Sequence, residues 1–157
     1  MDSIGLPPDT VTLATRLALA TLLGAMVGLN REISLKPAGL RTHALVALGA
    51  ALLSYIGLQL GRPVGDGAAA SRIIQGMVAG IGFIGGGVIL HRADVRMVHG
   101  LTTAASIWVV AAVGIAVGTG LWRAAVIAVT LALIVLTVGR KIDHIVHQIH
   151  SDDPDDN

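Results

Sequence analysis

The chain of 157 residues contains no cysteine, few aromatic residues and little charge. Without cysteine, disulfide frameworks, thiolate metal sites and cysteine nucleophiles are all excluded. Charged residues make up only 13% of the chain, about half of the share found in ordinary soluble domains. The formal net charge is +1, so the chain has no electrostatic footprint for nucleic acid, and we expect no nucleic-acid partner.

What the chain has instead is small and branched apolar residues. Apolar residues make up 54% of the sequence, glycine occurs 20 times, and the mean hydropathy is +0.76. An ordinary soluble core does not need this much apolar surface, whereas closely packed membrane helices have this mixture of Ala, Val, Leu, Ile and Gly. The composition therefore predicts an all-α, multi-pass membrane protein in a lipid bilayer.

Five apolar stretches approach the length of a membrane span, which is roughly 20 residues for a hydrocarbon core of about 30 Å. They are Val11–Leu29, Thr42–Leu60, Ile73–Leu90, Leu101–Val117 and Leu121–Val138. As one helix the last two would reach about 57 Å, so the chain has to reverse between them. Gly118-Thr119-Gly120 supplies the break and predicts a tight hairpin. We expect residues 1–140 to form a five-helix transmembrane bundle.

The basic residues are distributed unevenly between the two ends of this bundle. Seven Lys and Arg residues lie in segments on one side and three on the other, while Arg16 lies inside the first span. Because basic loops stay in the cytoplasm, this pattern predicts an outside N-terminus and a cytoplasmic C-terminus.

Residues 141–157 are expected to form a second, cytoplasmic unit. Their first part has apolar residues on one helical stripe and three histidines largely away from it, which predicts a short amphipathic helix on the membrane surface. The histidines are expected to form a solvated face and not a metal site. The acidic segment 151–157 has no apolar residue and is expected to be disordered. The apolar stripe consists of Ile142, Ile145, Val146 and Ile149, and the histidines are His144, His147 and His150.

A shift of 61 residues aligns the chain with itself at eight identities within 21 positions. The informative matches are Arg31 with Arg92 and the pattern G-L-x-T-x-A at residues 39–44 and 100–105. A true repeat relates the first two helices to the third and fourth in the same direction, with the fifth added. Chance similarity among Gly, Ala, Val and Leu is the alternative.

Glycine pairs at four-residue spacing predict close contacts between helix backbones. Such pairs serve packing within one bundle or a seam with a second copy or another membrane protein, and both interpretations remain open. The third predicted span is the richest in glycine, and each glycine weakens a helix by ~1 kcal/mol, which also allows an unwound stretch beside a cavity. The candidate packing residues are Gly24, Gly28, Gly76, Gly80, Gly82, Gly86, Gly114 and Gly118.

Two glycine-containing turns precede the second and fourth spans on the predicted cytoplasmic side. A helix start offers free N–H groups and a positive dipole end, and nearby arginines make such a turn a candidate site for phosphate or another anion. The alternative is that these residues cap their helices and touch lipid headgroups. The candidates in this motif are Arg31, Gly39, Arg41, Thr42, Arg92, Gly100, Thr102 and Thr103.

Carboxylates are missing from all five predicted spans. Mg²⁺ requires oxygen ligands, and ion-coupled transporters place carboxylates at membrane depth, so the sequence gives little support for a conducting path. We find no nucleophile beside a base and no phosphate-cradling loop with a lysine. We therefore expect no metal site, no cofactor and no enzymatic activity.

Four segments together resemble the MgtC/SapB family of bacterial inner-membrane proteins. They are residues 28–32 (GLNRE), 37–50 (PAGLRTHALVALGA), 81–89 (IGFIGGGVI) and 100–108 (GLTTAASIW), and the likeness spans residues 11–138 in order and spacing. The resemblance implies a five-helix inner-membrane protein linked to magnesium homeostasis. It further implies that the protein regulates other membrane proteins, and this role fits the family better than transport by the protein itself.

The chain departs from the family pattern at several points. Asn30 stands where the family often has an acidic residue, and Ala69 stands where it often has Asp. The resemblance also leads us to expect a short, SapB-like form without a soluble C-terminal domain. Our first hypothesis is a non-enzymatic regulator or accessory of magnesium or ion homeostasis that contacts a membrane partner or a second copy. The alternatives are a transporter or channel for Mg²⁺ or another small solute, and a phosphate or lipid sensor on the cytoplasmic face.

Overall fold

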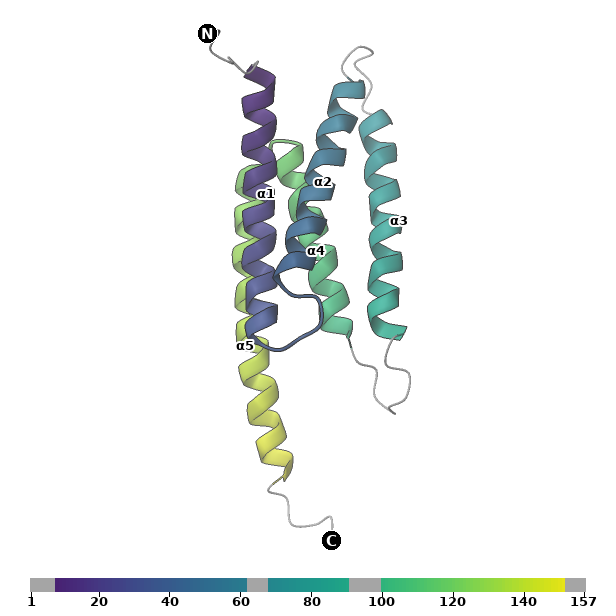
Figure 1. Ribbon diagram of the computed structural model, residues 1–157. Coiled ribbons are helices and arrows are strands. Elements are labelled where there is room, and N and C mark those ends of the chain that lie inside the picture. Colours follow the sequence, from purple (N-terminus) through teal and green to yellow (C-terminus); the bar gives the residue numbers. More distant parts are fainter. Residues whose placement is uncertain (1–7, 62–67, 91–99, 152–157) are drawn as a thin grey trace.

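A computed structural model describes residues 8–61, 68–90 and 100–151, and all five elements in these ranges are α-helices. Consecutive helices are antiparallel, so α1, α3 and α5 run one way and α2 and α4 the other (Figure 1). We call the end where α1 finishes and α2 and α4 begin the lower end, as it is drawn in Figure 1. The helices are α1 Pro8–Ile33, α2 Leu40–Gly61, α3 Ala68–Leu90, α4 Leu101–Gly118 and α5 Trp122–Ser151.

Each of the five helices is long and apolar enough to cross a membrane, which confirms the predicted fold class. The spans end within four residues of the predicted bounds, although α5 continues as a helix to Ser151. Arg31 and Glu32, which lie beyond the predicted end of the first span at Leu29, belong to the last turn of α1.

The turn between α4 and α5 confirms the predicted hairpin. α4 ends at Gly118, and the N–H groups of Thr119 and Gly120 donate to the carbonyls of Ile115 and Val117 at 2.9 and 3.0 Å. Gly120 has a φ of +93°, a left-handed conformation that glycine adopts without a steric penalty. The chain therefore reverses within three residues.

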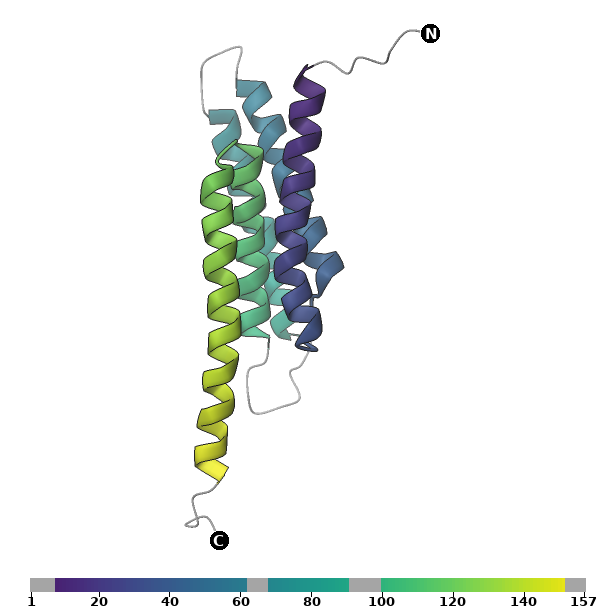
Figure 2. The ribbon, with the colours of Figure 1, turned by 90° about the vertical axis from the view of Figure 1, so that its left-hand side faces the viewer.

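The last helix is longer than predicted. Residues 141–150 are helical, as expected, but they continue α5 without a break to Ser151 instead of forming a separate helix on the membrane surface. No proline interrupts the segment, and a single Gly139 is not enough to end a helix. α5 consequently extends past the other helices at the lower end (Figure 2). The acidic tail expected after it lies outside the described residues.

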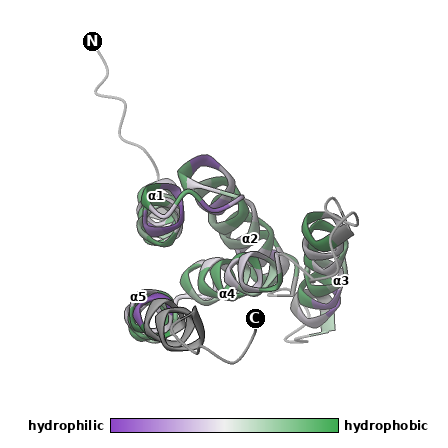
Figure 3. Cartoon of the chain, turned by 90° about the horizontal axis from the view of Figure 1, so that it is seen from below, coloured by the Kyte–Doolittle hydropathy of each residue, from purple (hydrophilic) through white to green (hydrophobic). Residues whose placement is uncertain are grey.

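The helices are arranged around a central pair. α2 and α4 pack together, α1 and α3 each contact both of them, and α5 contacts α4 and α1 (Figure 3). The buried core draws on α1, α2, α4 and α5, with Val27, Ala47, Val110 and Val129 among its members. Only 6% of the spanning window of α3 is buried, against 50% for α4. α3 is therefore a peripheral helix with most of its surface uncovered.

Candidate functional site

The glycines of α1 hold α2 at very short range. A Cβ atom added to Gly24 would lie 2.6 Å from the carbonyl oxygen of His43, and one added to Gly28 would lie 2.7 Å from the Cα of Leu40. No real side chain fits at such distances, so both positions are filled by the backbone of α2. This pair packs two helices of the same chain.

The glycines of α4 meet α2 from another side. A Cβ atom on Gly114 would lie 2.8 Å from the Cβ of Ala50, and one on Gly118 would lie 2.9 Å from the Cα of Ala51. α2 is thus held between two glycine seams, one from α1 and one from α4. Both seams lie inside the bundle.

The four candidate glycines of α3 lie in a different environment. A Cβ atom on any of them would meet nothing within 4 Å. The same sequence pattern therefore accompanies tight contacts on α1 and α4 and an open surface on α3. These residues are Gly76, Gly80, Gly82 and Gly86.

At the lower end, Arg31 crosses from the last turn of α1 to the first turn of α4. Its side chain is 5% exposed, and its Nη2 donates a hydrogen bond of 2.5 Å to Oγ1 of Thr103, which is also buried. The Nε of Arg31 is buried without a hydrogen-bond partner in the described part of the chain. Within the described residues, the Thr103 hydroxyl is therefore the one side-chain group that hydrogen-bonds to this buried guanidinium.

His43 joins α2 to α4 beside this pair. The ring is fully buried, with Nδ1 3.0 Å from the carbonyl oxygen of Gly39 and Nε2 3.0 Å from Oγ of Ser106. The Ser106 hydroxyl also lies 2.8 Å from the carbonyl oxygen of Thr103. Together with Arg31 and Thr103, these residues form what we call the lower polar cluster, and it ties α1, α2 and α4 together.

Glu32 caps the start of α2. Its Oε2 accepts a hydrogen bond of 2.8 Å from the backbone N–H of Leu40, the first residue of α2. A negative charge at a helix N-terminus is favourable because it faces the positive end of the helix dipole. A Cβ atom on Gly39 would lie 2.6 Å from the same carboxylate oxygen, so a side chain at this position would force the Glu32 carboxylate to shift.

The remaining candidates of the predicted anion motif do not join the cluster. Arg41 and Thr102 are exposed, and Thr42 is half-buried. Gly100 precedes α4 with a φ of +91°, and it has no space for a side chain because a Cβ atom would lie 2.9 Å from the carbonyl oxygen of Val88. Arg92 lies outside the described residues. The structure thus gathers Arg31, Gly39 and Thr103 from this motif, and an anion site there stays a prediction.

The sequence did not assign partners to Arg16, His43 or Glu32. Arg16 donates a 2.7 Å hydrogen bond from Nη1 to the carbonyl oxygen of Gly118, and its guanidinium lies 5.8 Å from the centre of the Tyr55 ring. It thereby satisfies a carbonyl at the C-terminal end of α4. For Arg16 the sequence did indicate that a partner exists, because a single charge inside an otherwise apolar span requires a polar partner.

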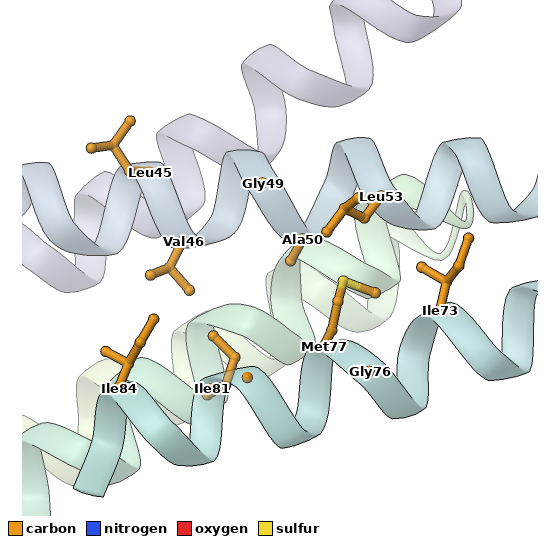
Figure 4. A pocket seen from close by; sticks show the side chains of 11 residues that line it. Leu45, Val46, Gly49, Ala50, Leu53, Ile73, Gly76, Met77, Ile81 and Ile84 are labelled. Atoms are coloured by element: carbon orange, nitrogen blue, oxygen red, sulfur yellow. The ribbon is translucent and has the colours of Figure 1, made fainter. Parts of the chain in front are cut away.

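An apolar groove of about 640 Å³ lies between α2 and α3 (Figure 4). Gly49 on α2 and Gly76 and Gly80 on α3 leave space in its walls, while aliphatic side chains and one methionine form the rest. Among the described residues, no charged side chain lines it. The lining residues are Leu45, Val46, Gly49, Ala50, Leu53, Ile73, Gly76, Met77, Gly80, Ile81 and Ile84.

These two regions have different chemistry. The lower polar cluster is closed and its polar groups mostly bond to one another, so it fixes three helices in place. The groove is open and apolar, so it suits an apolar helix or acyl chain and offers nothing to hold an ion. Within residues 8–61, 68–90 and 100–151, no three His, Asp or Glu side chains are grouped as they would be around a metal ion.

The chain is similar in sequence to several known proteins. The chain is 42% identical to SrpB of Synechococcus elongatus, over 92% of this chain and 85% of SrpB. It is 38% identical to YhiD of Escherichia coli K12, which carries the name of a proposed magnesium transporter, and 37% identical to MgtC of Brucella abortus. Those matches cover 85% and 82% of this chain but only 63% of YhiD and 52% of MgtC.

No solved structure shows significant similarity to this one. The model of the MgtC family matches residues 17–145, which include all of the spans except the first part of α1. The chain is a multi-pass membrane protein that belongs to the MgtC family.

Proposed function

We propose that this chain is a non-enzymatic protein of the bacterial inner membrane that supports magnesium or ion homeostasis through contacts between its helices and those of another chain. The observation that carries this proposal is the open apolar groove between α2 and α3. α1, α2 and α4 use their close-contact surfaces on one another, whereas Gly76, Gly80 and Gly82 of α3 are exposed and meet no neighbour. Uncovered small residues on a membrane helix are suited to contact with a further helix.

The charges inside the bundle also favour contact over passage of cations. Arg31 is buried among α1, α2 and α4 with one hydroxyl partner and no carboxylate beside it in the described residues. A buried guanidinium repels a divalent cation strongly, because electrostatic interactions weaken little in a low-dielectric interior. A route for Mg²⁺ through the lower polar cluster would have to pass this charge.

The proposed orientation follows from the basic residues near the lower end. Lys36, Arg41, Arg140 and Lys141 all belong to the segments where α1 finishes, α2 begins and α5 leaves the bundle. The positive-inside rule assigns such segments to the cytoplasm. Under this proposal the N-terminus lies outside, and the groove lies within the bilayer.

The proposal is tested by filling the groove in cells whose growth at low magnesium depends on this chain. Gly80→Leu places a large side chain in the groove, whereas Gly82→Leu places the same side chain outside it on the same helix. We expect Gly80→Leu to abolish the growth advantage and Gly82→Leu to retain it at equal protein levels. Equal growth of both variants would contradict the proposal.

The second candidate function is a transporter or channel for Mg²⁺ or another small solute. It is favoured by the name of the relative YhiD and by the glycine density of α3, which allows an unwound path lined by carbonyl groups. Under this candidate, bulky replacements at Gly85 or Gly86 abolish flux. The two functions differ in whether Mg²⁺ crosses a bilayer that contains this chain alone.

A further inference from the structure

The 61-residue repeat has a counterpart in the packing. Gly24 of α1 contacts α2 at His43, and the equivalent pair in the repeat is Gly85 of α3 and Ala104 of α4. A Cβ atom on Gly85 would lie 3.5 Å from the Cβ of Ala104, so the second pair makes the same contact at longer range. α1 and α3 lie on opposite sides of the central α2/α4 pair, and each contacts both (Figure 3). Exchanging α1 with α3 and α2 with α4 therefore preserves the arrangement.

α5 is the element that breaks this symmetry. It packs against α1 and α4, burying Ala125 and Val129, and Asn30 of α1 donates to Thr137 of α5 at 3.3 Å. The repeat places the counterpart of this position beside α3 and α2. No helix of the described chain lies there, and the groove does.

The residues on the two sides correspond. The core that α5 joins includes Ala20 and Leu23 of α1 and Val110 of α4. Moving 61 residues forward takes Ala20 and Leu23 to Ile81 and Ile84, and moving 61 residues back takes Val110 to Gly49. All three of these positions line the groove. By the repeat, the groove beside α2 and α3 therefore corresponds to the side of α4 and α1 that α5 covers, and the equivalent occupant is a helix that runs in the direction of α5.

We propose that the occupant is α3 of a second copy, so that two chains pair across their α2/α3 grooves about a two-fold axis normal to the membrane. This inference rests on the proposed function, in which the groove is a contact surface between chains. A second copy inserted with the same topology presents an α3 that runs in the required direction, because α1, α3 and α5 are parallel (Figure 1). A two-fold interface uses the same surface on both partners, and α3 is both a wall of the groove and the helix with the least burial.

The glycines of α3 fit this pairing. Gly76 and Gly80 face the groove four residues apart, and nothing lies within 4 Å of a Cβ atom added to either. Small residues at this spacing let two parallel membrane helices approach with their backbones nearly in contact. In a pair of chains, Gly76 and Gly80 of one α3 meet the same residues of the other α3. The contact between the two helices offsets the helix propensity that each glycine costs.

Disulfide trapping tests the pairing directly, because the natural chain has no cysteine and a substituted residue carries the only thiol. Met77→Cys places the thiol in the groove, and Phe83→Cys places it on the outer face of α3, where Phe83 is 86% exposed. In native membranes treated with a mild oxidant, we expect several-fold more covalent dimer from Met77→Cys than from Phe83→Cys. Equal yields from the two variants, or no dimer from Met77→Cys, would overturn the inference.

A second measurement keeps the inference separate from the proposed function. Purified, fluorescently labelled chains in lipid vesicles at high dilution should bleach in two steps, and Gly80→Leu should shift them to one step. If the natural chain bleaches in one step while Gly80→Leu still abolishes growth at low magnesium, the groove binds a different membrane protein. In that case the second copy is refuted and the proposed function stands.

Discussion

The glycine seam between α1 and α2 makes a prediction in which the same substitution has opposite effects at two sites. Gly24→Ala places a Cβ atom 2.6 Å from the His43 carbonyl oxygen and 2.7 Å from the Ala47 Cβ. These distances fall 0.8 and 0.7 Å short of ordinary contact, which begins at 3.4 Å, and one of the neighbours is backbone. α1 and α2 must therefore move apart, and overpacking of this kind costs about 1–3 kcal/mol.

The matched substitution is Gly82→Ala on α3, where the new Cβ atom meets nothing within 4 Å. It should cause no loss, or a gain of up to about 1 kcal/mol from the better helix propensity of alanine. The assay is the free energy of unfolding of each purified variant in bicelles, measured by steric trapping. If Gly24→Ala is as stable as Gly82→Ala, the α1/α2 contact is not as close as the structure has it.

Three further substitutions test the polar contacts, each measured by the free energy of unfolding in bicelles. Thr103→Val removes the hydroxyl that Arg31 uses and should cost about 2–3 kcal/mol, whereas the same change at the exposed neighbour Thr102 should cost little. Equal losses would contradict this assignment. Ser106→Ala leaves Nε2 of His43 buried without its partner, with an expected cost of about 1–3 kcal/mol, and an unchanged stability would show that the ring is satisfied otherwise. Glu32→Ala removes the cap of α2 and should cost about 1 kcal/mol, while Glu32→Gln, which keeps an acceptor oxygen, should lose less.

The spans could be predicted because the bilayer imposes a length and a polarity on each helix. Apolar runs of the required length, together with the break at Gly118–Gly120, fix the number of helices and the hairpin. The end of α5 was not predictable in the same way. A change from apolar to amphipathic composition marks where a helix leaves the membrane, but only proline or a cap marks where it ends.

The candidate site was predictable only in part. Four-residue glycine spacing indicates a surface suited to contact, yet it does not say whether the contact lies inside the chain, as at Gly24, or on an open face, as at Gly80. The side-chain partners of Arg31 and His43 come from α4, more than 60 residues away in the chain, so no local pattern identifies them. The repeat at 61 residues was the one long-range signal, and it relates Ala20 and Leu23 of the core to Ile81 and Ile84 of the open groove.

The central claim is that this protein works through contact between helices and does not conduct Mg²⁺, and flux into vesicles tests it most directly. The purified chain is reconstituted into liposomes that contain a Mg²⁺-sensitive dye, and Mg²⁺ is added outside with an imposed membrane potential. We predict uptake equal to that of protein-free vesicles. Uptake well above that background, abolished by Gly85→Leu or Gly86→Leu in correctly folded protein, would contradict the account.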